Sequence, residues 1–168
     1  MTTGQPMQLA QLNIARMLAP LEDPVMADFV ANLERINQLA EQSPGYVWRL
    51  ETPDGDATAI RTFGEDYLVN LSVWENIDSL FEFVYRSNHA SIMSQRKQWF
   101  ERLRDAYTAL WWIPAGHLPT PEEAKVKLEQ LRTRGPTPDS FTFKQPFPPP
   151  GEMATGPLES YDDSCPAT

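Results

Sequence analysis

The stretch that most constrains the fold runs from Tyr67 to Phe100 and reads YLVNLSVWENIDSLFEFVYRSNHASIMSQRKQWF. Side chains alternate between the two faces of a strand, so residues 67–74 predict a strand with one apolar face and one mixed face. The apolar face holds Val69, Leu71 and Val73. The mixed face holds Leu68, Asn70, Ser72 and Trp74. A chain with such a strand must bury the first face and find a use for the second.

The residues after this strand predict a helix, a polar break and a second helical segment. Asn76 is a suitable N-cap, and Ile77, Leu80, Phe81 and Val84 recur at the spacing of one helical face. We expect this helix to pack on the apolar face of the strand, which would leave the mixed face uncovered. The polar break then presents His89 ahead of the second segment.

The rest of the chain supplies three more predicted strands and one more helix. Residues 8–16 alternate like the first stretch, with Gln11 and Asn13 on the mixed face. Asp23 and Pro24 predict the start of a helix that ends before Ser43-Pro44-Gly45. Further strands are predicted at 46–51 and 107–113, and residues 56–66 fit either a hairpin extension or a surface loop. The predicted order is βαββαβ.

This order is typical of an α+β, ferredoxin-like unit with an antiparallel sheet. Thr120, Pro121 and Glu123 form a helix start, so we predict an extra C-terminal helix over 120–134, appended to the core unit. Phe141 to Phe143 are a candidate for a short edge strand. We therefore expect one domain over residues 1–145, followed by a flexible, Pro-rich acidic tail over 146–168.

Composition excludes several classes of partner. The net charge is −9, and no stripe of Lys and Arg offsets it, so we expect binding neither to nucleic acid nor to anionic membranes. The sequence has no apolar run long enough to span a bilayer and no secretory signal, which indicates a cytoplasmic protein. With two histidines and a single Cys165 in the predicted tail, we expect no metal site and no intrachain disulfide.

Long segments of the chain closely resemble a microbial family that is labelled as a domain of unknown function. They include QLNIARMLAPLEDPVMADFVANLERIN, SPGYVWRL, LWWIPAGHLPTPEEA and LRTRGPTPDSFTF, besides the stretch from Val69 to Phe100. That family resembles the dimeric α+β barrel superfamily, which includes antibiotic-biosynthesis monooxygenases. The resemblance implies a homodimer in which two ferredoxin-like halves pack their sheets face to face, and this packing would cover the mixed faces.

Several side chains are candidates for a site on the mixed face. Asn13, Asn70 and Ser72 would orient a phenolic or carbonyl substrate and stabilise an enolate, although amides at a dimer interface would look the same. Aromatic residues would exclude water, or serve as plain core. They are Trp48, Trp74 and Trp112. Arg49 is a candidate for an anionic group, with a surface role as its alternative.

The other candidates are the histidines and a cluster of basic residues. His89 is the candidate catalytic acid or base, and its alternative is a helix-end residue bonded to the backbone. His117 follows a turn, where a solvated residue is the ordinary interpretation. Four basic residues on the second helical segment alternate with acidic residues, so we expect them to form a solvated helix face without function. They are Arg96, Lys97, Arg102 and Arg104.

The leading hypothesis is a small-molecule enzyme, either a cofactor-independent monooxygenase or a proton-transfer enzyme, that acts on an aromatic or polyketide-like substrate. It follows from the superfamily resemblance and His89, and it requires no cofactor. The alternative is a non-catalytic dimer that binds a small ligand or has a structural role. A third hypothesis comes from similarity to the haem-degrading branch, which implies haem with His89 as its axial ligand.

Overall fold

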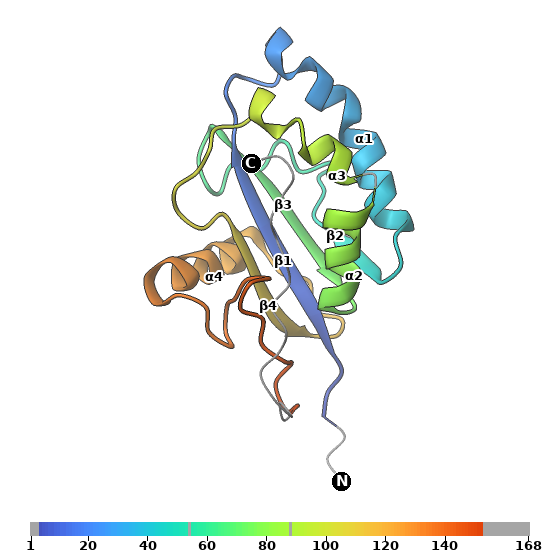
Figure 1. Cartoon of the computed structure of the whole chain (residues 1–168), viewed down its shortest axis with the longest axis vertical. Coiled ribbons are helices and arrows are strands. Elements are labelled where there is room, and N and C mark those ends of the chain that lie inside the picture. Colours follow the sequence, from blue (N-terminus) through green and yellow to red (C-terminus); the bar gives the residue numbers. More distant parts are fainter. Residues whose placement is uncertain (1–3, 54, 88, 153–168) are drawn as a thin grey trace.

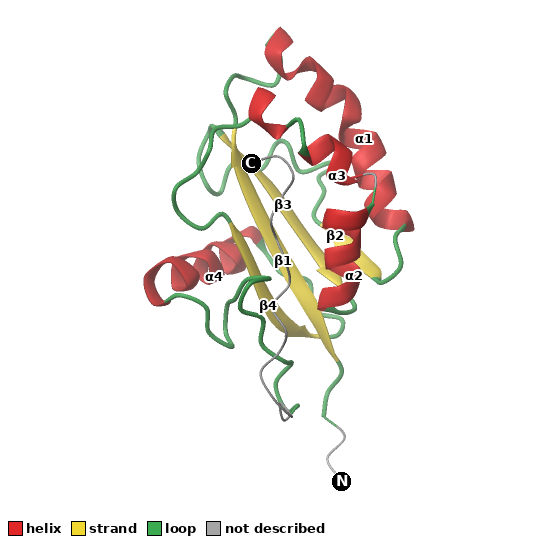
Figure 2. Ribbon diagram, viewed as in Figure 1, coloured by secondary structure: helices red, strands yellow, loops and turns green. Residues whose placement is uncertain are grey.

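The computed structural model describes residues 4–53, 55–87 and 89–152, except for the side chains of His89 and Ala90. Four antiparallel strands form one sheet in the order β2-β3-β1-β4 (Figures 1 and 2). They are β1 (Met7–Arg16), β2 (Tyr46–Arg49), β3 (Tyr67–Trp74) and β4 (Thr108–Pro114). With the helices between them, these strands confirm the predicted α+β fold of ferredoxin-like βαββαβ type.

The helices begin and end at residues with clear local chemistry. They are η1 (Pro24–Met26), α1 (Ala27–Gln42), α2 (Ile77–Phe81), η2 (Glu82–Arg86), α3 (His89–Met93), η3 (Arg96–Gln98) and α4 (Pro121–Arg134). Asn76 caps α2 by accepting from the Ser79 N–H at 2.9 Å, and Thr120 caps α4 by accepting from the Glu123 N–H at 3.1 Å. Both caps were predicted.

Gly45 sets the approach of β2 to α2. Its φ of +82° lies in the left-handed region, and a Cβ there would collide with the Ser79 hydroxyl. The close contact lets the Gly45 carbonyl accept from the Glu75 N–H at 2.8 Å, directly before the Asn76 cap. The glycine thus joins the start of β2 to the start of α2.

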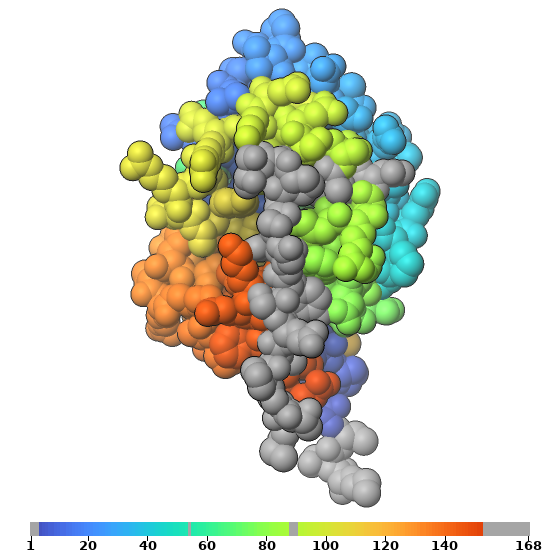
Figure 3. Space-filling model, in the orientation of Figure 1, coloured from blue at the N-terminus to red at the C-terminus, as the bar shows by residue number. Residues whose placement is uncertain are grey.

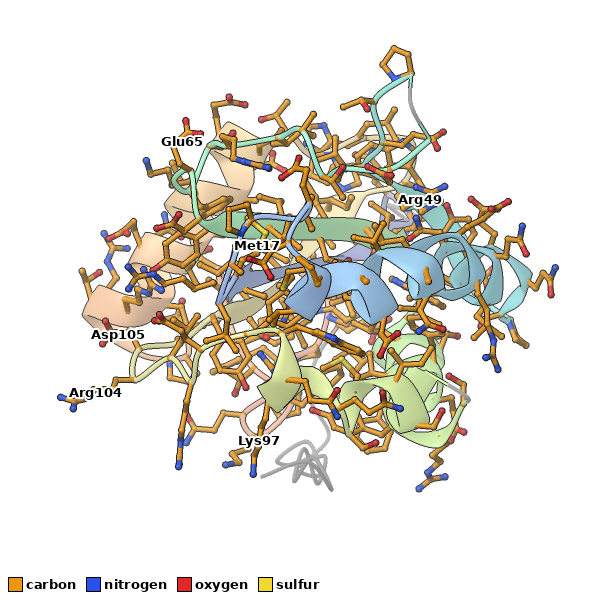
Figure 4. The ribbon with its side chains drawn as sticks, turned by 90° about the horizontal axis from the view of Figure 1, so that it is seen from above. Met17, Arg49, Glu65, Lys97, Arg104 and Asp105 are labelled. Carbon is orange, nitrogen blue, oxygen red and sulfur yellow. The ribbon has the colours of Figure 1, made fainter. Side chains whose placement is uncertain are left out.

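The two faces of the sheet are covered in a way that differs from our prediction. The face that carries Leu9 and Trp74 packs against α1 and α2, so the helix that begins after Asn76 covers the mixed face. The expectation that this helix packs on the apolar face, leaving the mixed face open, is therefore wrong. In Figure 4, Lys97 and Glu65 lie on opposite sides of the sheet.

Helix α4 and the segment between β2 and β3 cover the apolar face. Three α4 residues, Ala124, Leu128 and Leu131, are buried in the same cluster as Leu71 and Trp111 of the sheet. The predicted role of α4 as an appendage to the core is wrong, because its buried stripe closes that core. Leu50, Ile60 and Phe63 complete the cover, which makes residues 56–66 a packed loop.

The chain after α4 returns to the sheet. Phe141 forms an isolated bridge with Leu110 of β4, where a short edge strand was predicted. Phe147 packs against Phe141, and its carbonyl accepts from Trp112 Nε1 at 2.8 Å. Residues 146–152 of the predicted tail are described, whereas 153–168, with Cys165, lie outside the described residues. None of the helices in the described part has both the length and the apolar character that a membrane crossing requires.

Candidate functional site

A cavity of about 390 Å³ lies between the mixed face of the sheet and the helices α1, η2 and α3. This volume falls within the range of small-molecule sites. Its floor consists of mixed-face side chains from β1 and β3. They are Gln11, Asn13, Ala15, Leu68, Asn70, Ser72 and Trp74. The face that we expected to meet a second sheet is therefore the floor of a cavity within one chain.

Polar side chains form a row across three neighbouring strands of this floor. Asn13 of β1 pairs in register with Asn70 of β3 on one side and with Thr108 of β4 on the other. Asn13 Nδ2 donates to Thr108 Oγ1 at 2.9 Å. This bond uses the amide nitrogen and leaves Asn13 Oδ1 as an acceptor for another group. All three residues line the cavity. Alternation along the strands thus placed Asn13 and Asn70 together, as predicted.

A second set of polar side chains lies deeper in the floor, and its members form hydrogen bonds with one another. Trp74 Nε1 donates to Ser72 Oγ at 2.9 Å, and Ser72 Oγ donates to Gln11 Oε1 at 2.8 Å. Gln11 Nε2 in turn approaches the Asn70 carbonyl oxygen at 3.4 Å. These bonds hold Ser72 and Gln11 in place, as buried polar groups require. The side-chain amide of Asn70 takes no hydrogen bond with the described residues and is exposed to the cavity.

Aromatic and aliphatic side chains form the walls. Phe83 stacks on Trp74 with ring centroids 5.1 Å apart, and Phe29 contacts the rings of Trp99 and Phe100 at 5.6 and 5.0 Å. Leu33 and Ile36 of α1 and Ile92 of α3 add aliphatic surface. Flat rings around a few polar atoms suit a flat, mostly apolar ligand with one or two oxygen atoms.

The wall opposite the sheet departs from regular helix. Residues Glu82–Arg86 of η2 form a π-helical turn, and Phe83, Val84 and Tyr85 from this turn line the cavity. Such turns occur frequently at functional sites, because the extra residue changes the direction of the side chains. The π turn occupies the end of the helix that we predicted after Asn76 and the first residues of the predicted polar break.

Two guanidinium groups reach the cavity, one predicted and one missed. Arg49 was predicted as a candidate for binding an anionic group. Arg96 was assigned to a solvated helix face, yet it is half-buried and lines the cavity beside Tyr107. Its spacing from Ile92 and Phe100, i, i+4 and i+8, places it on the apolar face of a helix. That spacing was the sequence signal for Arg96. Figure 4 shows that Lys97 and Arg104, in contrast, point away from the body.

Arg49 lies at the edge of the cavity in a network of acidic residues. Its Nε pairs with Glu41 at 2.9 Å, and its Nη2 pairs with Glu51 at 3.1 Å and donates to the Gly55 carbonyl at 3.0 Å. Nearby, burial raises the pKa of Tyr46 above its usual value of 10.0, Arg49 lowers it, and the two carboxylates raise it further. Arg49 is thus held by the protein itself.

Two of the three tryptophans expected around a cavity lie elsewhere. Trp48 packs against the cluster on the apolar face, and Trp112 donates to the Phe147 carbonyl. Only Trp74 of the three lines the cavity. Along β4, Trp112 lies on the same face as Thr108, but beyond the part of the sheet that the cavity covers. Alternation predicts the face of the sheet on which a side chain lies, but it does not predict which part of that face the cavity covers.

The structure describes the side chain of His117 but not that of His89. His117 Nε2 lies 2.8 Å from Glu123 Oε1 at the start of α4, away from the cavity lining. His89 begins α3, which borders the cavity, but its side chain lies outside the described residues. Its predicted roles as base or haem ligand therefore stay predictions. Within the described residues, no group of three or more acidic, His or Cys side chains is placed to hold a metal ion.

The upper end of the cavity is closed by segments far apart in the sequence. The Leu18 N–H donates to the Trp99 carbonyl at 2.8 Å, and Met17 bridges to Phe100. In the space-filling view, the yellow-green segment around η3 adjoins blue residues near the start of α1 (Figure 3). These contacts hold Arg96, Trp99 and Phe100 over the sheet.

The profile of a family described as "Domain of unknown function (DUF3291)" matches residues 8–156. Among solved structures, the chain is similar to the NE2512 protein of unknown function from Nitrosomonas europaea, with 14% identity and a TM-score of 0.42, over 70% of this chain and 98% of that one. It is also similar to SnoaB, a cofactor-independent oxygenase from Streptomyces nogalater, with 15% identity and a TM-score of 0.41, over 68% and 97% of the chains. No curated protein matches the chain.

Proposed function

The chain belongs to the DUF3291 family, whose description assigns no activity, and we propose that it is a small-molecule enzyme that acts in the cavity between sheet and helices. The substrate is a flat aromatic molecule with a phenolic or carbonyl oxygen. The observation that carries this proposal is the Asn70 amide, which faces an aromatic-walled cavity and takes no hydrogen bond with the described residues.

The polar row supports the orientation of such a substrate. Asn70 offers an N–H donor to a carbonyl or phenolate oxygen, and Asn13 Oδ1 offers an acceptor to a hydroxyl at the neighbouring position of the sheet. Donors fixed on strands lose little entropy when charge develops on the substrate oxygen, so they stabilise an enolate effectively. Trp74 holds Ser72, and Ser72 holds Gln11, which stiffens this floor.

The proposed chemistry is proton transfer from an enolisable substrate, with dioxygen as a co-substrate in the monooxygenase form. His89 is the proposed base, since it begins the helix that borders the cavity. The enolate of an anthrone transfers electrons to dioxygen, and a new C–O bond at the carbon opposite the carbonyl gives a hydroperoxide after protonation. Loss of water from that hydroperoxide gives the anthraquinone, so one oxygen atom of dioxygen stays in the product and the other leaves as water. A naphthoquinol would give a hydroxynaphthoquinone by the same route. Such chemistry requires no metal or organic cofactor.

The test measures oxygen consumption and quinone formation with anthrones and naphthoquinols. His89→Ala should abolish turnover, and Asn70→Ala should lower kcat by about 100-fold, the effect of removing one donor to a developing oxyanion. Asn32→Ala is the matched control, because the Asn32 amide bonds only to the Asp28 carbonyl of its own helix and does not line the cavity. Equal rates in Asn70→Ala and the wild type would refute the role of the amide.

A non-catalytic binding protein is the second candidate, and one observation favours it. Asp56 is the only carboxylate among the described lining residues, and it accepts from both the N–H and the hydroxyl of Thr58, at 2.9 and 2.6 Å. Both bonds go to Asp56 Oδ1, so among the described lining residues the single carboxylate already has one of its two oxygens bonded. Quenching of Trp74 and Trp99 fluorescence by the same compounds, without product, would identify a binding protein. Asn70→Ala should then weaken binding by about tenfold.

A further inference from the structure

The two arginines of the cavity differ in how many partners they have. The Arg49 guanidinium bonds to Glu41, Glu51 and the Gly55 carbonyl, and its side chain is 15% exposed. Its charge is balanced by two carboxylates, and its Nε and Nη2 both have partners. A ligand anion would have to displace these partners. Arg49, the arginine that sequence reasoning selected, is therefore poorly suited to bind a ligand.

Arg96 has the opposite character. Its guanidinium carbon lies 5.1 Å from the centroid of the Tyr107 ring, and it forms no ion pair with a carboxylate of the described residues. Acidic residues outnumber basic ones in this chain by 23 to 14, yet this half-buried arginine has no carboxylate partner among the described residues. The cation lies over the Tyr107 ring, a contact that uses none of its N–H groups, and none of these groups bonds to the described residues.

The position of Arg96 relates it to the polar row of the floor. Arg96 and Thr108 both line the cavity, and Thr108 forms one end of the row, while Asn70 forms the other end. The row crosses two strand spacings, so its ends are roughly 10 Å apart. A planar molecule of two or three fused rings fills this length. Its two ends would meet an arginine and an amide.

We infer that the ligand of the cavity is an aromatic carboxylate, with its carboxylate on Arg96 and a hydroxyl or carbonyl oxygen at the opposite end on Asn70. This inference rests on the proposed function and adds the substrate class. The planar guanidinium of an arginine presents two parallel N–H groups, the geometry that a carboxylate accepts in bidentate form. The carboxylate also supplies the counter-ion that the chain itself does not provide.

The test compares 6-hydroxy-2-naphthoate with its methyl ester by isothermal titration calorimetry at neutral pH. This acid has its hydroxyl and carboxylate at opposite ends of two fused rings. We expect the wild type to bind the acid at least tenfold tighter than the ester. Arg96→Gln should weaken binding of the acid by about 10- to 100-fold and leave the ester unchanged. Arg104→Gln, which removes a cation that points away from the body, should bind both like the wild type.

Two further variants separate the possible outcomes. Arg96→Lys keeps a charge but not the planar fork, so it should retain part of the preference for the acid, and its far-UV circular dichroism checks the fold. Asn70→Ala should weaken acid and ester alike. Equal affinity of the wild type for acid and ester would overturn the carboxylate assignment and leave the proposed function intact. Failure of the acid, the ester and the neutral quinols to bind would overturn both.

Discussion

At the scale of single residues, Tyr46 gives the clearest link between burial and pH. Burial raises its pKa above 10.0, and the Glu41 and Glu51 carboxylates raise it further against the opposing effect of Arg49. Above pH 10 the unfolded chain loses this proton, whereas the folded chain keeps it. The stability that this tyrosine contributes is therefore complete below pH 10, and it is lost as the pH rises through the raised value.

We predict that the wild type loses more stability than Tyr46→Phe between pH 9 and pH 11. The phenylalanine keeps the edge contact with Trp74, at 5.7 Å between centroids, but has no proton to lose. Urea unfolding midpoints at several pH values measure the difference. Parallel pH profiles for the two proteins would show that Tyr46 ionises equally in both states, contrary to the prediction.

The residues of the candidate site show what a sequence can reveal at this scale. Asn13, Asn70 and Ser72 were predicted on one face because alternation in a strand is a local property. Arg96 had a local signal in its spacing from Ile92 and Phe100, but its contact with Tyr107, on the approach to β4, is tertiary and has no local signal. The partners of Arg49 likewise come from the end of α1 and the loop after β2, and no local pattern predicts them.

At the scale of elements, α4 is part of the core. Leu128 is 1% exposed within the cluster on the apolar face, whereas Val126 on the same helix is 55% exposed. We predict that Leu128→Ala lowers the free energy of unfolding by about 2–5 kcal/mol, the cost of a cavity in a packed core. Val126→Ala, the matched control, should change it by less than about 0.5 kcal/mol. Chemical denaturation measures both.

The alternative for α4 gives a different result in the same experiment. If α4 were only appended to the domain, it would unfold separately. Leu128→Ala would then leave the main unfolding transition of the sheet unchanged. Two transitions, with only the first one shifted, would support the appended helix. One cooperative transition that shifts as a whole would confirm that α4 and the sheet share a core.

Element boundaries followed from the sequence more closely than element packing did. The strand at 67–74 and the caps Asn76 and Thr120 depend on neighbours within a few residues. Which face of the sheet α2 covers depends instead on the tertiary packing of all the helices. The mixed face also carries Leu9, Leu110 and Trp74, which accept an amphipathic helix at one end while the amides stay in the cavity. Periodicity alone does not distinguish these arrangements.

At the scale of the whole molecule, both faces of the sheet are covered within one chain. Helices α1 and α2 lie on the mixed face, and α4 with the loop before β3 lies on the apolar face. The homodimer was expected from the family resemblance, with the mixed faces covered at its interface, but in this structure the helices of the same chain already cover that face. The homodimer stays a prediction from the family resemblance, and its interface would have to use other surfaces than an open sheet face.

The cavity also has a consequence for the stability of the whole protein. A hollow of about 390 Å³ in a small domain forfeits packing that filled space would provide. Ala40 of α1 is buried at the cavity wall, so a larger side chain there would grow into open space. Alanine and leucine are both good helix formers, which leaves packing as the main difference. Filling the cavity should thus favour folding and oppose binding.

We predict that Ala40→Leu raises the free energy of unfolding by about 0.5–2 kcal/mol and weakens ligand binding at least tenfold. Ala31→Leu, at an exposed position of the same helix, is the matched control and should change neither. For the wild type, a ligand at 100 times its Kd should add about 2.7 kcal/mol of stability, and at the same ligand concentration this gain should fall to about 1.4 kcal/mol or less in Ala40→Leu. Thermal unfolding with and without 6-hydroxy-2-naphthoate measures both effects. A variant that is more stable yet binds equally well would place the ligand outside the cavity, because the filled space and the binding site would then be different.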